Sequence, residues 1–129
     1  MTVALSIRNT VRNIINDLGS DATLYPFASA TKSYNEEGEV TVSSWGSSSS
    51  IKVIGSNHYA LRRLLKSQGE ENNDSERVII VRDDVTIAHR DKLTISTDIY
   101  LVNEVKKIDP IENTLIAQRC VLVKDALYV

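Results

Sequence analysis

The chain has 129 residues, of which 42% are hydrophobic and 25% are charged, as is ordinary for a globular domain. Its formal net charge of -2 gives no general positive field for coating nucleic acid, and its single cysteine, Cys120, excludes an intrachain disulfide. The sequence shows neither a signal peptide nor an apolar run near the roughly 18 residues of a membrane span. We therefore expect one soluble domain over residues 1–129 that is made in a reducing cytoplasm and does not enter a membrane.

The first segment has the periodicity of an amphipathic helix. The apolar residues that recur at three- and four-residue steps, and so share one face, are Ile7, Val11, Ile14, Ile15 and Leu18. Gly19 can take the left-handed conformation that ends a helix. We predict a helix over residues 3–18 that packs through this face on the rest of the protein or on a neighbour.

The next segment reads as a hairpin. Residues 22–34 are rich in β-forming and small residues, and Pro26 marks a bend or an edge within them. Residues 35–38 form a turn signal because their last residue is a glycine. Alternating residues follow over 40–44, so we predict two strands around a four-residue turn.

A less regular region follows this hairpin. Residues 46–50, made of glycine and serine, predict a flexible link before a strand at 51–54. Residues 58–66 can form a short second helix. Residues 67–76 have no apolar side chain to bury, so they predict a long, exposed polar loop that becomes ordered only in an assembly.

The remainder of the chain is rich in short apolar β-runs. They lie close together and are separated by turn residues; the runs are 77–83, 85–87, 92–95, 99–105 and 114–123. Such spacing leaves no room for the crossover helices of a parallel sheet. The predicted fold is therefore mainly β, with a small antiparallel barrel or sandwich over residues 22–124.

The sequence offers no constellation for catalysis or for a cofactor. Its histidines, His58 and His89, and Cys120 have no metal-binding spacing, and the glycines form no phosphate-binding motif. Cys120 lies inside an apolar run, where a thiol behaves as a small hydrophobic side chain. The adjacent pair Asp83 and Asp84 predicts a turn, because neighbouring strand residues point to opposite faces. We therefore expect a protein that is not an enzyme and has no cofactor, catalytic residue or metal site.

Contact residues are the remaining candidates for function. Trp45 is either a structural anchor or an interface anchor, since tryptophan is enriched at binding hot spots. The basic group of the predicted second helix suits a solvated face, a protein contact or DNA. The candidate interface residues are Trp45, Arg62, Arg63, Lys66, Gly69, Glu70, Glu71 and Asn72.

Two local patterns stand out in this order of elements. Residues 34–39 (YNEEGE) form the turn that leads to the strand ending at Trp45, and residues 91–95 (DKLTI) lead through a turn to residues 99–105 (IYLVNEV). Over about residues 20–124, this order resembles the head-closure (stopper) proteins of long-tailed phages. Subunits of that family often carry a hairpin of the form D-x-hydrophobic, turn, Y-x-V-x-x-V.

The resemblance implies a small β-barrel with long loops and peripheral helices, and it brings no catalytic residues. It implies self-association into a ring, hexameric in the family, at the neck of the virion. Such a ring has the portal or its adaptor above it and the tail terminator or tail tube below it. It holds packaged DNA in its channel without sequence specificity and presents a surface to the tail.

Two departures keep other functions open. The predicted helix at 3–18 is longer than in a minimal member of the family, and Thr97-Asp98 replaces a glycine that is usual in the second turn. A tail completion or tail terminator protein is therefore one alternative. A stand-alone small barrel that binds nucleic acid or a peptide on its strands is another.

Overall fold

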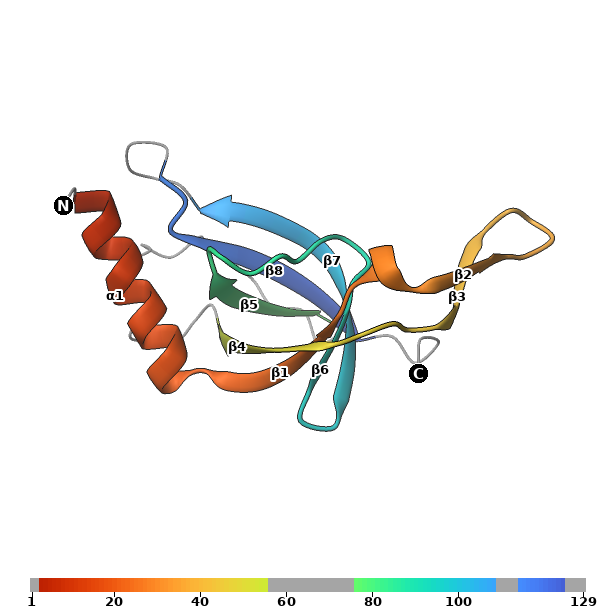
Figure 1. The fold of residues 1–129 in the computed structure, drawn as a ribbon, viewed down its shortest axis with the longest axis horizontal. Coiled ribbons are helices and arrows are strands. Elements are labelled where there is room, and N and C mark those ends of the chain that lie inside the picture. The colour runs from red at the N-terminus through yellow and green to blue at the C-terminus, as the bar shows by residue number, and fades with distance from the viewer. Residues whose placement is uncertain (1–2, 56–75, 109–113, 125–129) are drawn as a thin grey trace.

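The computed structural model describes residues 3–55, 76–108 and 114–124, and its main body is a closed antiparallel barrel (Figure 1). The strand order around the barrel is β1-β4-β5-β8-β7-β6, while β2 and β3 form a separate two-stranded sheet. The elements are α1 (Val3–Leu18), β1 (Ser20–Tyr25), a short 3-10 turn (Phe27–Ser29), β2 (Thr31–Tyr34), β3 (Val40–Ser44), β4 (Ser49–Gly55), β5 (Glu76–Arg82), β6 (Lys92–Ile95), β7 (Asp98–Ile108) and β8 (Ala117–Lys124). The predicted mainly β fold with an N-terminal helix is confirmed, and its architecture is a barrel rather than a sandwich.

Some predicted segments have different boundaries or lie outside the described residues. The second helix at 58–66 and nearly all of the polar loop at 67–76 lie outside them, and Glu76 already belongs to β5. The link predicted at 46–50 is shorter than expected, because β4 begins at Ser49 and its first residues pair with β1. The serines near its end therefore contribute to the barrel wall.

Helix α1 has the predicted bounds and packs on the outside of the barrel, where it contacts β4, β5 and β8. Val11 and Ile15 are fully buried, but Leu18 is 48% exposed, so its predicted place in the packed face is wrong. Leu18 is the last residue of the helix. Gly19 after it does not have the left-handed conformation expected from the sequence, since Gly38 is the described glycine with a positive φ, and it serves instead to let the chain approach β4 closely. A Cβ atom on Gly19 would lie 2.8 Å from the carbonyl oxygen of Val53.

The apolar residues form two clusters, one on each side of the barrel wall. The cluster inside the barrel contains Leu24, Val53, Ile79, Val81, Leu93, Val102, Cys120 and Leu122. The cluster between the barrel and α1 contains Val11, Ile15, Ile54, Ile80, Ile108, Ile116 and Ala117. Successive strand residues point to opposite faces, so the continuous apolar run in β5 supplies both clusters.

The strand predicted at residues 85–87 is absent. The side-chain amide of Gln118 donates a hydrogen bond to the carbonyl oxygen of Val85 at 2.7 Å, and the carboxylate of Asp91 accepts one from the backbone of Ala88 at 2.8 Å. Side chains thus satisfy backbone groups that a strand would have paired with a neighbour. This segment is irregular chain between β5 and β6, and its Ile87 is buried in the cluster inside the barrel.

The β2–β3 hairpin projects from the barrel at the end opposite α1 (Figure 1). Its turn is built as predicted: Gly38 has a φ of 82°, and the side-chain oxygen of Asn35 accepts hydrogen bonds from the backbone of Glu37 at 3.0 Å and of Glu39 at 2.8 Å. Residues 22–34 do not form one arm of it, however. Their first part belongs to the barrel, and the hairpin begins only after the bend at the proline.

Candidate functional site

Of the candidate interface residues from the sequence, Trp45 lies within the described residues. The basic group of the predicted second helix and the residues of the polar loop lie outside them; these are Arg62, Arg63, Lys66, Gly69, Glu70, Glu71 and Asn72. The geometry around Trp45 is therefore the part of the predicted site that the structure describes.

Trp45 is half-buried where the projecting hairpin joins the barrel. Its ring meets the ring of Tyr25 edge-on at 6.4 Å between centroids, and the ring of Phe27 in the same manner at 6.5 Å. The chain then passes close to the 3-10 turn, because a Cβ atom on Gly46 would lie 2.7 Å from the carbonyl oxygen of Ser29. These contacts favour the interpretation of Trp45 as an anchor that fixes the hairpin to the barrel.

Three basic side chains lie over these aromatic rings. The Lys32 ammonium is 4.6 Å from the centroid of Phe27, and the Arg90 guanidinium is 5.3 Å from the same centroid. Lys92 lies 4.7 Å from the centroid of Tyr25. Each distance falls within the range of a cation–π interaction. We call this group the aromatic–basic patch; it consists of Tyr25, Phe27, Lys32, Trp45, Arg90 and Lys92.

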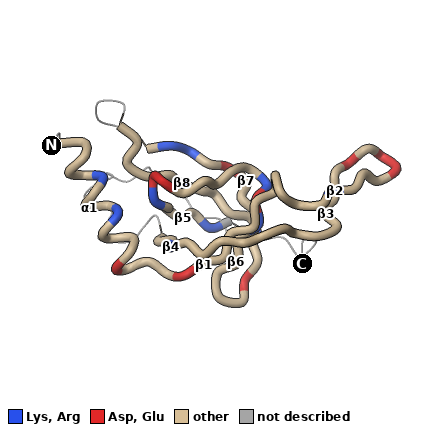
Figure 2. Tube along the Cα trace, in the orientation of Figure 1, with Lys and Arg blue, Asp and Glu red and all other residues tan. Residues whose placement is uncertain are grey.

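The positive charge of the aromatic–basic patch is not balanced by ion pairs within residues 3–55, 76–108 and 114–124. The carboxylate nearest in sequence, Asp91, is only 4% exposed and accepts backbone hydrogen bonds from Phe27 and Ala88, both at 2.8 Å. Several other basic residues of the described chain are paired with aspartates, among them Arg8 and Arg12 of α1, where Figure 2 shows two basic positions. The patch is thus a positively charged surface with an aromatic floor.

The backbone of Arg90 is unusual. Its φ of 77° lies in the left-handed region, which residues other than glycine rarely adopt. Its N–H donates a hydrogen bond to the carbonyl oxygen of Val102 at 2.8 Å, which helps to hold this conformation. Arg90 is therefore presented at the patch by a fixed backbone.

Sequence reasoning missed most of this patch. Tyr25 and Phe27 flank a proline and lie near Lys32, which is a weak local signal. Lys92 comes to the patch only because β1 pairs with β6 and places Tyr25 opposite it. That register cannot be read from spacing along the chain.

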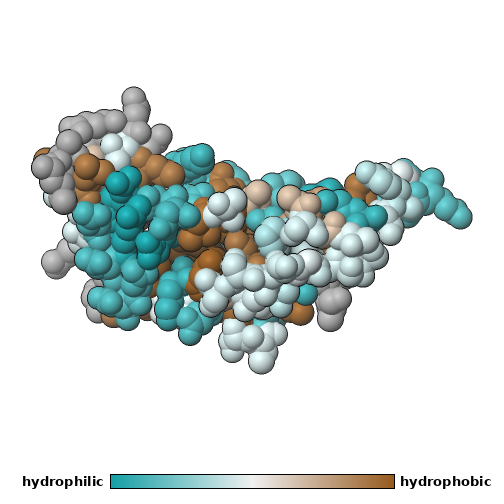
Figure 3. Space-filling model, viewed as in Figure 1, coloured by the Kyte–Doolittle hydropathy of each residue, from teal (hydrophilic) through white to brown (hydrophobic). Residues whose placement is uncertain are grey.

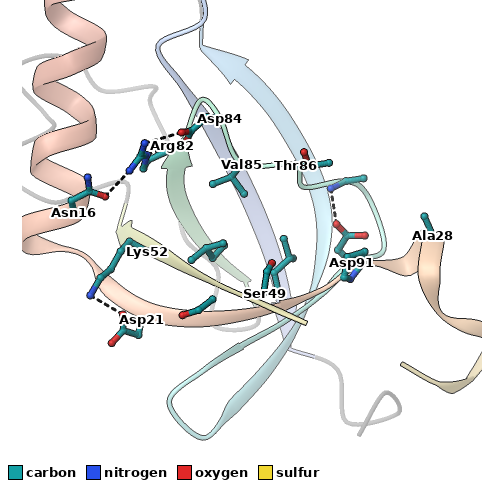
Figure 4. Close-up of a pocket in the computed structure, with 15 residues that line it drawn as sticks. Asn16, Asp21, Ala28, Ser49, Lys52, Arg82, Asp84, Val85, Thr86 and Asp91 are labelled. Atoms are coloured by element: carbon teal, nitrogen blue, oxygen red, sulfur yellow. Dashed lines mark hydrogen bonds and ion pairs between the residues drawn. The ribbon is translucent and has the colours of Figure 1, made fainter. Parts of the chain in front are cut away.

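A pocket of about 690 Å³ opens beside β4, on the barrel side of α1 (Figure 4). It exists because β4 pairs with β5 only from Val53 onward, so Ser49–Lys52 have a strand neighbour on the β1 side alone among the described residues. The irregular chain after β5 lines the other side of this pocket with Val85, Thr86 and Ala88. Apolar surface gathers in the middle of the same face of the molecule (Figure 3), and the pocket lining includes Leu24 and Val85.

The charged groups at the rim of this pocket pair with one another. Lys52 meets Asp21 at 2.7 Å, and Arg82 meets Asp84 at 2.7 Å and the side-chain oxygen of Asn16 at 3.1 Å. Figure 4 shows these pairs lying across the rim rather than converging on a common point. The pocket therefore has the form of a groove beside an open strand edge, with its rim charges neutralised.

A buried carboxylate joins α1 to the barrel. Arg12 donates two hydrogen bonds to Asp83, each 2.7 Å long, and Arg8 lies 3.8 Å from the same carboxylate. The side chain of Asp83 is only 7% exposed. Burial by itself raises the pKa of Asp83, but the hydrogen bond and charge of Arg12, with the charge of Arg8, outweigh it and hold the pKa below its usual value. We call Asp83 with Arg12 and Arg8 the Asp83 clamp; it holds α1 on the barrel and does not form a reactive site.

Cys120 points into the barrel interior and is fully buried. Burial raises the pKa of its thiol to about 12, so the reactive thiolate is scarce at neutral pH. Within the part of the chain that the structure describes, no three His, Cys, Asp or Glu side chains gather as a possible metal site. No described helix has the length and apolar character needed to cross a membrane.

Comparison with known proteins adds no family to these observations. No model of a known protein family matches the chain, and no curated protein gives a significant match. The fold and its surfaces are therefore the observations that bear on function.

Proposed function

We propose that this chain is a structural subunit of a phage neck. It acts as a head-closure (stopper) or head–tail connector protein and forms a ring between the portal or its adaptor and the tail. The ring retains packaged DNA and provides the surface to which the tail attaches. The subunit works by assembly, without a catalytic step, and resides in the virion.

The observation that carries this proposal is the projecting β2–β3 hairpin. Both of its strands are largely exposed, and neither pairs with a barrel strand. A lone two-stranded hairpin is marginally stable in water. Here its base is anchored by the rings around Trp45 and its tip by the side chain of Asn35. An arm that is anchored at its base, has an ordered turn at its tip and pairs with no barrel strand suits a contact with another subunit.

The position of this arm also supports a ring. The hairpin lies at one end of the molecule and α1 at the other (Figure 1). The arm of one subunit can therefore contact a surface of the next subunit that is not that subunit's own arm. Contacts between two different surfaces form closed rings when the rotation between subunits closes. The stopper resemblance implies a small β-barrel with long loops and peripheral helices, and a barrel with α1 packed on its outside is compatible with that architecture.

A binding module for nucleic acid is the second candidate, and the aromatic–basic patch favours it. Barrel proteins that bind single strands combine basic grooves with aromatic side chains. The rings of Tyr25 and Phe27 beside Arg90 and Lys92 have that composition. This candidate would be preferred if neck assembly proceeds without the protein.

The test is removal of the gene from the phage that carries it. Particles should package DNA but fail to retain it or to join tails, as seen by electron microscopy and by nuclease protection of the genome. Supplying the intact chain in trans should restore tailed particles. Heads that keep their DNA but lack tails would move the role to tail completion, and intact tailed particles would contradict the proposal.

A further inference from the structure

We propose that the tip of the β2–β3 hairpin of one copy docks on the aromatic–basic patch of a second copy. Copies of this chain would then join head to tail. The inference deepens the proposed function, because a ring supplies the second copy, and the aromatic–basic patch supplies the receiving surface.

The hairpin tip is acidic, rigid and unpartnered. Glu36, Glu37 and Glu39 all lie in the turn, and the structure shows no ion pair for them in the described part of the chain. Figure 2 shows these acidic residues at the far end of the hairpin. Because hydrogen bonds to the side chain of Asn35 order the turn, its backbone loses little entropy on binding. Tyr34, beside them, is 72% exposed and offers a large ring for contact.

The patch matches the tip in charge and in surface type. Within the described ranges, its basic groups, Lys32, Arg90 and Lys92, have no carboxylate partner, and the three tip glutamates have no basic partner. Its half-buried rings add apolar surface beside these charges, which the exposed ring of Tyr34 can contact edge-on because the cations already lie over the ring faces. Opposite charges on the two surfaces would set the register of such a contact and speed its formation.

A chain cannot satisfy this contact with its own tip. Thr31 and Glu36 are separated by a strand that rises by about 3.3 Å per residue, so the tip lies roughly 15 Å from the patch at the base of the same hairpin. The pairing of β2 with β3 holds the arm extended. The tip and patch therefore meet only between copies, and the contact uses two different surfaces, as a ring requires.

A nucleic acid is the competing occupant, and the geometry favours it less. Base stacking needs an open ring face, but the cations already lie over the rings of Phe27 and Tyr25, and Lys92 also lies 5.7 Å from the centroid of Trp45. The net charge of -2 adds no wider attraction for phosphates. DNA binding is therefore an outcome of the test rather than the expectation.

The first experiment reverses the charge of the hairpin tip in one variant and the charge of the aromatic–basic patch in another. A tip variant carries Glu36→Lys and Glu37→Lys, and a patch variant carries Lys32→Glu and Arg90→Glu. We expect each purified full-length variant to self-associate at least tenfold more weakly than the wild type in sedimentation velocity. An equimolar mixture of the two should recover association, because each tip then meets a patch of opposite charge. The control Lys106→Glu/Lys107→Glu changes exposed residues of β7 outside the patch and should leave association unchanged.

The second experiment detects the contact even when it is too weak for sedimentation. A chain with Glu37→Cys and a chain with Ala28→Cys are mixed and oxidised; both positions are exposed, and the native Cys120 is buried. A disulfide-linked heterodimer is expected. Replacing the second chain by Thr97→Cys, which is exposed in the turn between β6 and β7, should give none.

The outcomes separate this inference from the proposed function. The contact is overturned if the tip variant associates as strongly as the wild type. It is also overturned if the mixture of variants does not recover association and the second experiment gives no heterodimer. Gene removal still tests the neck role independently. A wild type that stays monomeric and gives no tip–patch disulfide would also overturn it. The patch variant is also titrated into a fluorescently labelled 20-nucleotide DNA strand. Loss of DNA binding with intact self-association would assign the patch to nucleic acid instead.

Discussion

Truncating Ile15 to alanine should destabilise the protein much more than truncating Leu18, although both residues belong to the apolar face read from the sequence. Ile15 is fully buried between α1 and the outer barrel wall, whereas Leu18 is 48% exposed. Ile15→Ala removes three buried carbon atoms at about 0.8 kcal/mol each, or roughly 2.4 kcal/mol. The cavity left behind brings the expected loss to about 3 kcal/mol, within the usual range of about 2–5 kcal/mol. Leu18→Ala should lower the free energy of unfolding by about 1 kcal/mol or less.

Urea unfolding of the full chain, followed by far-UV circular dichroism, measures both losses by linear extrapolation. The two variants are matched, since each replaces a residue of α1 by alanine and so changes helix propensity in a similar way. Equal losses for Ile15→Ala and Leu18→Ala would refute the reasoning. A loss below about 1 kcal/mol for Ile15→Ala would show that α1 does not pack on its own barrel as described.

Three further predictions concern Asp83, Cys120 and Gly19. Asp83→Asn should lower the free energy of unfolding by about 1.5–3 kcal/mol at neutral pH, because the clamped arginine loses a charged partner. The folded-state pKa of Asp83 is lowered, so its stabilisation is present above the unfolded pKa of about 3.9 and is lost as pH falls through the folded value. The gap between the urea midpoints of variant and wild type should therefore narrow in acid, and a gap of constant size would contradict a stabilising charged Asp83. Cys120, with its pKa raised to about 12, should react with a thiol reagent only as the protein unfolds, so rapid labelling of the native chain would contradict its burial. Gly19→Ala would place a Cβ atom 2.3 and 2.8 Å from two carbonyl oxygens and should cost about 1–3 kcal/mol, whereas Gly55→Ala, which meets nothing within 4 Å, should change the unfolding free energy by less than about 0.5 kcal/mol.

The sequence by itself determined the features that depend on neighbours a few residues apart. The three- and four-residue spacing of apolar side chains predicted the helix over residues 3–18, which has those bounds in the structure. The glycine after an acidic turn predicted the hairpin tip, where Gly38 indeed has a positive φ. The closely spaced apolar runs predicted an antiparallel mainly β fold. Each of these signals lies within a short window of the chain.

The tertiary structure alone decided which of these segments meet. The strand expected at residues 85–87 is irregular because Gln118, far along the chain, takes one of its carbonyl oxygens. Asp83 reads as a turn residue in the sequence but also holds α1 through Arg12. The aromatic–basic patch likewise depends on the register between β1 and β6. Register and helix docking are set by contacts between residues distant in sequence, and the packing energy that selects them is spread over the whole core rather than encoded at any one position.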